Sequence, residues 1–114
     1  MNRASTNEND CLVIAEGIEL SRNTLRQLAK RYHIRKLSLF GSAARGEMRP
    51  NSDIDLLIEF EPGKAPSLGG LAEIQDVFSK LLGGRKVDLA TPSILTNPFR
   101  RRSIEQDIET IYAA

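Results

Sequence analysis

The chain has 114 residues, with 16 Lys and Arg against 15 Asp and Glu, and a formal net charge of +1. This length suits one domain with a modest core, and the balanced charge argues against a dedicated nucleic-acid binder. The single cysteine, Cys11, excludes an internal disulfide and suits a reducing compartment. No apolar run approaches the roughly 18–20 residues of a membrane span, and the polar N-terminus lacks a signal-peptide pattern. We therefore expect a soluble, cytoplasmic protein.

The N-terminal region is expected to differ from the rest of the chain. Residues 1–10 have no apolar periodicity, which is typical of poorly ordered termini. Residues 12–15 form a short apolar run before Gly17, and periodicity cannot decide between a strand and the start of a helix. We expect residues 1–17 to be a flexible or poorly defined segment and residues 18–114 to form a single domain.

Two segments have the spacing of amphipathic helices. In residues 21–33 and 68–82, apolar side chains recur at intervals of three and four, which places them on one helical face. Ser21 or Asn23 can cap the first helix, and Gly83–Gly84 ends the second. The apolar positions are Leu25, Leu28, Ala29 and Tyr32 in the first, and Leu71, Ile74, Val77, Phe78 and Leu81 in the second.

A third helix is predicted to run from Pro98 to the C-terminus. Asn97–Pro98 is a suitable cap and first helical residue. Arg100–Arg102 lies near its start, where positive charges oppose the helix dipole. This basic run is either a solvated helix tip or a contact for a partner or a phosphate. The apolar stripe expected on this helix consists of Ile104, Ile108, Ile111 and Tyr112.

Three segments are typical of strands, namely residues 34–40, 53–60 and 86–90. The second has an almost continuous apolar run, which favours burial on both faces, and Thr91–Pro92 ends the third. Residues 61–67 contain two prolines and a glycine, which indicates a loop. In chain order these elements predict a fold of the α/β (α+β) class, with helices packed on a small mixed sheet of about three strands.

Gly41–Ser42 directly follows the first predicted strand. Glycine lets the chain turn sharply and lets a phosphate approach the backbone closely. If Ser42 opens a short helix, its hydroxyl and the first N–H groups point at an anion. Gly-Ser at a strand end is most often only a turn. The pair therefore indicates a phosphate site only in combination with the residues near it.

Asp53 and Asp55 lie two residues apart on the second predicted strand. Residues at this spacing share a strand face, roughly 6–7 Å apart, so their carboxylates repel each other unless a divalent cation lies between them. Hard oxygen ligands of this kind suit Mg²⁺, especially when substrate phosphates complete its shell. The alternative is that Asp53 ends the turn and Asp55 is a solvated edge residue.

Asp88 interrupts the apolar third strand and needs a partner there. Arg85 or Lys86 could pair with it, or it could join the same metal site. If the first two strands are antiparallel neighbours and the third lies beside the second, Gly41–Ser42 and all three aspartates meet at one end of the sheet. That arrangement would fit two-metal in-line transfer, with ions roughly 3.5–4 Å apart.

The pattern Gly-Ser, ten residues, Asp-x-Asp and a later acidic strand residue resembles the nucleotidyltransferase superfamily that includes DNA polymerase beta. The chain is similar to its short, single-domain members, the minimal nucleotidyltransferases. The resemblance covers about residues 18–112, and the stretches that carry it are residues 40–46 (FGSAARG), 52–60 (SDIDLLIEF) and 85–92 (RKVDLATP). It implies an α/β fold with a mixed sheet, and transfer of a nucleoside monophosphate from a nucleoside triphosphate with release of pyrophosphate.

The resemblance also implies roles for the three aspartates. Asp53 and Asp55 match the ligands of both Mg²⁺ ions. Asp88 matches the third carboxylate, which holds the catalytic ion and could activate the acceptor hydroxyl as a base. All three acidic positions are filled, so an active enzyme using ATP and two Mg²⁺ ions is expected.

The glycine-serine turn and a nearby arginine have counterparts as well. Gly41 and Ser42 match the turn that binds the triphosphate. Arg45 matches the arginine of the family's Ala-Arg-Gly element, where it either contacts a phosphate or forms a salt bridge that braces the turn.

Many minimal members resemble antitoxins that are paired with a small helical ribonuclease toxin of the HEPN family. The resemblance therefore implies transfer of AMP from ATP to a hydroxyl of the toxin, expected to be a tyrosine. The rival hypotheses are a binding module that neutralises its partner by contact, and transfer to a small molecule. An exposed sheet edge or apolar patch would favour a homo- or hetero-oligomer.

Overall fold

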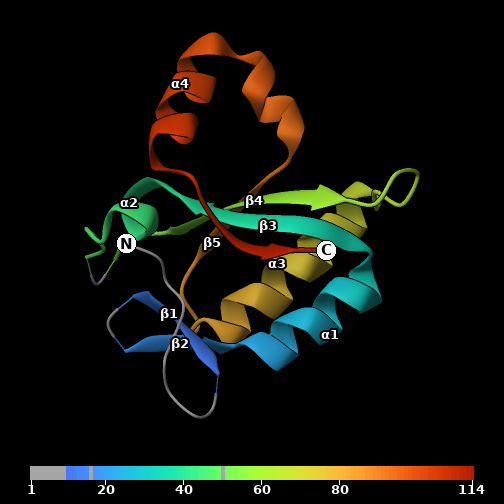
Figure 1. The fold of residues 1–114 in the computed structure, drawn as a ribbon, viewed down its shortest axis with the longest axis horizontal. Helices are drawn as coiled ribbons and strands as arrows, with labels where there is room; N and C mark the ends of the chain where they lie inside the picture. Colours follow the sequence, from blue (N-terminus) through green and yellow to red (C-terminus); the bar gives the residue numbers. More distant parts are fainter. Residues whose placement is uncertain (1–9, 16, 50) are drawn as a thin grey trace.

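A four-stranded mixed sheet forms the centre of the protein in the computed structural model, which describes residues 10–15, 17–49 and 51–114 (Figure 1). The strand order is β5-β4-β3-β6. Strand β3 is antiparallel to both β4 and β6, whereas β5 is parallel to β4. The strands are β3 (Ile34–Phe40), β4 (Ile54–Phe60), β5 (Val87–Ala90) and β6 (Glu109–Ala113). The predicted α/β class and mixed sheet are confirmed, and the sheet has one strand more than expected.

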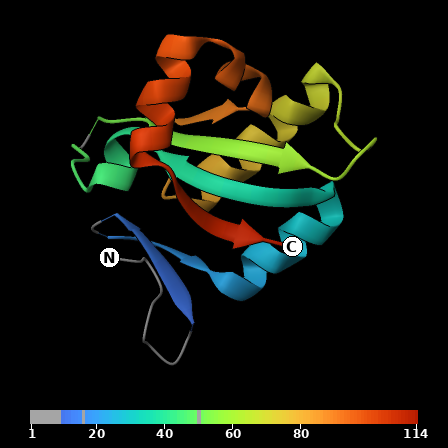
Figure 2. The same ribbon diagram turned by 45° about the horizontal axis from the view of Figure 1, so that its top comes forward.

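Helices cover the two faces of this sheet (Figures 1 and 2). Helices α1 (Arg22–Tyr32) and α3 (Leu68–Leu81) lie on one face, where Leu25 and Phe78 join the main core. Helix α4 (Pro98–Asp107) and the short 3-10 helix η1 (Pro92–Thr96) lie on the other face. A second, smaller cluster of Phe40, Leu57 and Ile104 is buried there.

The predicted starts of the first two helices agree with the structure to within one residue. The Ser21 hydroxyl accepts a hydrogen bond from the backbone N–H of Thr24 at 3.3 Å, so Ser21 is the N-cap of α1. Ser67 caps α3 in the same way, with 3.2 Å from the N–H of Gly70 to its Oγ. Both caps satisfy a backbone donor that the first helical turn leaves without a partner.

The apolar run whose conformation was left open is a strand. Strand β1 (Cys11–Ala15) pairs antiparallel with β2 (Ile18–Ser21), and Leu12 and Ile14 are buried in the main core. The expected boundary after residue 17 therefore falls inside this hairpin. Residues 1–9, for which disorder was expected, lie outside the described residues.

The predicted helix at the C-terminus is wrong after Asp107, because the last residues form β6 at the open edge of β3. Ile108, Ile111 and Tyr112 follow helical spacing, yet Glu109–Ala113 is rich in β-branched and aromatic side chains, which favour strands. Pairing with β6 satisfies the backbone groups that β3 would otherwise expose at an edge. Ile111 is 8% exposed, whereas Ile108 is 37% exposed and does not join a core stripe.

None of the described helices is long and apolar enough to cross a membrane.

Candidate active site

The sheet places the residues predicted for the site toward the same end. In the antiparallel ladder of β3 and β4, Phe40 pairs with Asp55. In the parallel ladder of β4 and β5, Asp55 pairs with Asp88. The short helix α2 (Gly41–Arg45) begins where β3 ends, so it too lies at this end of the sheet. Asp53 precedes the first residue of β4 by one position and is therefore not itself in the strand.

Gly41 lies against the carboxylate of Asp55. Its φ is +69°, in the left-handed region that glycine adopts far more readily than other residues. A Cβ atom on Gly41 would collide with Asp55 Oδ2 and would lie 3.2 Å from Asp55 Cγ. Only a residue without a side chain therefore lets the start of α2 approach this carboxylate. Ser42, the next residue, is half-buried in the first turn of α2.

The carboxyl group of Asp55 is held in an unfavourable environment for its charged form. Its pKa is raised, first by burial and then by the negative charges of Asp88 and Asp53. Arg100 and Arg45 act in the opposite direction and lower the pKa of Asp55. Repulsion among carboxylates that a fold holds together is the electrostatic situation that a bound cation relieves.

The raised pKa predicts that Asp55 destabilises the folded protein at neutral pH. At a pH below the ordinary pKa of 3.8, Asp55 is protonated and neutral in both the folded and the unfolded chain. Its ionisation then has no effect on stability. As the pH rises through the higher pKa of the folded state, the unfolded chain ionises more readily, so the folded state loses stability. We expect Asp55→Asn to raise the melting temperature at pH 7.5 in EDTA, and the gain to vanish near pH 3.5. A gain that is equal at both pH values would contradict this assignment.

The other two aspartates are more exposed to solvent than Asp55. Asp53 Oδ2 lies 3.9 Å from Lys86 Nζ, and the side chain of Asp88 is exposed. Within the described ranges, no three His, Cys, Asp or Glu side chains converge as a metal site. The donor set still fits Mg²⁺, because all three candidate ligands are carboxylates and their charges act on one another at Asp55.

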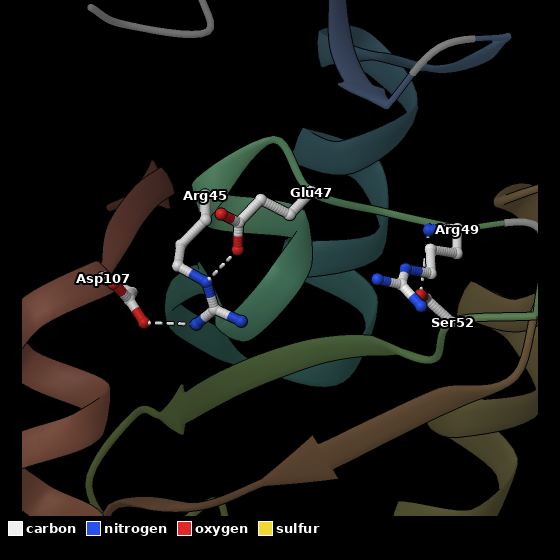
Figure 3. Close-up of polar contacts among 5 residues, drawn as sticks. All are labelled: Arg45, Glu47, Arg49, Ser52 and Asp107. Carbon is white, nitrogen blue, oxygen red and sulfur yellow. Dashed lines mark hydrogen bonds and ion pairs between the residues drawn. The ribbon is translucent and has the colours of Figure 1, made fainter.

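Arg85 positions the segment that leads into Asp53, rather than pairing with Asp88. Its Nη2 donates to the carbonyl oxygens of Arg49 at 2.7 Å and Ser52 at 2.6 Å. The Ser52 hydroxyl also accepts from the N–H of Arg49 at 2.9 Å, just before the strand (Figure 3). The sequence did not predict this contact. Arg85 and Lys86 are adjacent and carry the same charge, and only the fold shows which groups each of them contacts.

Arg45 is engaged by two carboxylates from different parts of the chain (Figure 3). Its Nε donates to Glu47 Oε1 and its Nη1 to Asp107 Oδ2, both at 2.7 Å. These hydrogen bonds raise the pKa of Arg45, with Glu47 as the larger cause. Asp107 ends α4, so the guanidinium links α2 to α4. Of the two roles left open for Arg45, bracing the turn is the one that these contacts support.

The ion pair of Arg45 and Asp107 is expected to contribute only modestly to stability, because Arg45 is largely exposed. We expect Arg45→Gln to lower the melting temperature at low salt by a small amount. The same change in an Asp107→Asn background should lower it less, since the partner is already neutral. A double-mutant cycle of thermal unfolding at low and high salt measures this coupling, which salt should reduce. Equal losses in both backgrounds would mean that the contact does not couple the two elements.

Comparisons with known proteins agree with the geometry. Residues 20–111 match the family of nucleotidyltransferase domains. The chain is 38% identical over 95 residues to MJ1379 of Methanocaldococcus jannaschii, which is named for protein adenylyltransferase activity; the match covers 83% of this chain and 94% of that protein. It is 40% identical over 81 residues to the protein adenylyltransferase MntA of Thermococcus cleftensis, covering 71% of this chain and 79% of MntA.

Two solved structures share the fold. One is described as a minimal nucleotidyltransferase, with a TM-score of 0.61 and 32% identity, covering 77% of this chain and 86% of that one. The other is a toxin–antitoxin crystal structure with AMP-PNP, with a TM-score of 0.63 and 17% identity, covering 83% of this chain and 75% of that one.

The match over residues 20–111 shows the class of protein: the chain belongs to the nucleotidyltransferase family. The approach of Gly41 to Asp55, beside the register pair of Asp55 and Asp88, is compatible with it. Within that family it is a minimal nucleotidyltransferase, similar in sequence to the MntA-type protein adenylyltransferases.

Proposed function

We propose that the protein transfers AMP from ATP to a hydroxyl group of a partner protein and thereby acts as an antitoxin. The observation that carries this proposal is the approach of Gly41 to Asp55 beside the register pair Asp55 and Asp88. The similarity to MntA of Thermococcus cleftensis supports a protein as the acceptor. A fold neighbour that is a toxin–antitoxin complex with AMP-PNP supports ATP as the donor and a toxin as the partner.

Different residues of the chain would perform different parts of the reaction. We assign Gly41 and Ser42 to the triphosphate, because the glycine leaves the backbone open to a phosphate. Asp53, Asp55 and Asp88 would hold Mg²⁺. The ions, when bound, would neutralise phosphate charge and polarise the reacting oxygen atoms. Arg45 keeps the bracing role that its contacts with Glu47 and Asp107 support.

The proposed reaction is an in-line displacement at the α-phosphorus of ATP. The acceptor hydroxyl oxygen forms the new bond to this phosphorus, and the bond from the α-phosphorus to the bridging oxygen breaks. Pyrophosphate leaves with that oxygen and its electron pair. The hydroxyl proton passes to a carboxylate, for which the exposed Asp88 is the candidate because an acceptor can reach it.

The partner that we propose is a helical toxin of the HEPN type, and the acceptor atom is the hydroxyl of a tyrosine. The compartment that we propose is the cytoplasm, where ATP and Mg²⁺ are available and where a lone cysteine stays reduced. Contact alone could also neutralise such a partner, and the experiment below separates the two possibilities.

The test is intact-mass analysis of a helical HEPN-type protein as the acceptor. That protein is incubated with this chain, ATP and Mg²⁺, and in parallel with the Asp53→Asn variant. A gain of one or more AMP units that is absent with the variant is expected, and peptide mapping then identifies the modified residue. A stable complex without any gain in mass would favour neutralisation by contact. If the incubation gives no gain in mass and no complex, this partner is rejected.

A further inference from the structure

One face of helix α4 looks toward the candidate active site. Residues 100, 104 and 107 are spaced by four and three positions, which places them on a single helical stripe. Ile104 in this stripe is 2% exposed and packs with Phe40 and Leu57. Asp107 in the same stripe forms the ion pair with Arg45 of α2. Two independent contacts therefore fix which way this face of α4 points.

The same contacts place the stripe beside Asp55. Phe40 is the register partner of Asp55 on β3, and Leu57 lies two residues beyond Asp55 on the same face of β4. Arg100 lies one helical turn before Ile104, so it shares the side of α4 that rests on these residues. Arg100 therefore lies on the side of the sheet that carries Asp55.

The three consecutive arginines of α4 are not equivalent. Arg101 pairs with Glu105 at 3.4 Å, and Arg101 and Arg102 line a groove on another side of the helix together with Glu105 and Gln106. Arg100 is exposed and forms no ion pair with any carboxylate in the described part of the chain. Among the described residues it is thus the one member of the run that combines a guanidinium without an ion pair with a position on the face of α4 that packs over the Asp55 side of the sheet.

We propose that Arg100 binds the phosphate chain of the nucleoside triphosphate and stays with the pyrophosphate as it leaves. This inference rests on the nucleotidyl transfer proposed above and adds a binding residue to it. A guanidinium donates two parallel hydrogen bonds to phosphate oxygens. It also offsets the repulsion between the phosphates and the three aspartates, and it favours the charge that develops on the departing group.

Nucleotide affinity measured without any acceptor tests this inference. Isothermal titration calorimetry with Mg²⁺ compares wild type, Arg100→Gln and Arg102→Gln, using α,β-methylene ATP and AMP as ligands. Arg102→Gln is the matched control, because it removes the same charge from the same helix on the side turned away from the site. We expect Arg100→Gln to weaken binding of the triphosphate by about tenfold to a hundredfold. Binding of AMP should change little, and Arg100→Lys should retain part of the affinity.

Equal losses for the triphosphate and AMP would overturn the assignment, because Arg100 would then not act on the phosphate chain. Equal losses in Arg100→Gln and Arg102→Gln would also overturn it, because general electrostatics would account for both. Thermal unfolding checks that each variant is folded, and Arg100→Lys provides a second route if Arg100→Gln is not. The proposed antitoxin function can fail independently of this result, since the titration contains no partner protein.

Discussion

Asp55→Asn is expected to lower the rate of AMP transfer by about a thousandfold or more, the scale of several kcal/mol of transition-state stabilisation that metal ligands support. Asp55 is the register partner of Asp88 and the residue that Gly41 approaches, so it lies at the centre of the proposed site. Asparagine keeps the shape of the side chain and removes only its charge. The loss should therefore accompany the higher melting temperature expected for this variant at pH 7.5. A steady-state assay of pyrophosphate release with the acceptor present measures the rate.

Asp76→Asn is the matched control for this change. Asp76 is an exposed carboxylate on α3, where it pairs with Lys80 at 3.0 Å. The same change of chemistry there should leave transfer unaffected. Wild-type rates in Asp55→Asn would exclude Asp55 as a metal ligand and would remove the main support for the proposed mechanism. Asp88→Asn should lose transfer as well, whereas an active Asp88→Asn would leave Asp55 and Asp53 as the essential pair.

The same variant separates catalysis from neutralisation by contact. If AMP transfer is what protects cells, co-expression of Asp55→Asn with the partner should fail to relieve toxicity, although the two proteins can still associate. Relief by the inactive variant would mean that the chain acts as a binding module. A co-purification of the two proteins shows whether the variant still binds, so loss of binding cannot be mistaken for loss of chemistry.

Gly41→Ala is expected to abolish measurable transfer and to destabilise the fold. The backbone at residue 41 has a φ of +69°, which costs a residue with a side chain about 1–2 kcal/mol. The added methyl group would also collide with Asp55 Oδ2. The carboxylate or the turn must then move, and displacement of a reacting group by about 1 Å can cost on the order of a hundredfold in rate. Transfer assays and thermal unfolding of the purified variant measure the two effects.

Gly63→Ala separates the collision from the backbone strain. Gly63 has a φ of +75° and nothing within 4 Å of the place where its Cβ would lie. It follows β4, whereas Asp55 lies near the start of that strand, so the two positions are at opposite ends. We expect Gly63→Ala to lose a similar amount of stability and to keep its transfer activity. If both variants lose activity alike, reduced stability rather than contact with Asp55 explains the result.

Local patterns predicted most of the elements of this protein but not the conformation of its C-terminus. Helices α1 and α3 have regular apolar spacing and capping serines, so their existence and their starts could be read from the sequence. Residues 108–113 satisfy both a helical stripe and a β-branched strand, and spacing alone could not separate the two. The open edge of β3 decides between them, because it offers backbone partners that only a strand can use.

The order of residues by itself determined the candidate chemistry. Gly41, Ser42, Asp53 and Asp55 are close in the chain, and the types and spacing of these residues indicated a phosphate turn beside carboxylates. The tertiary structure decided which distant side chains meet them. Arg45 bonds to Asp107, 62 positions away in the chain. The packing of Ile104 on Phe40 and Leu57 decides which face of α4 lies against the sheet. Such contacts depend on how α4 docks on the sheet. Docking follows from the packing of the whole fold, which no local pattern of residues encodes.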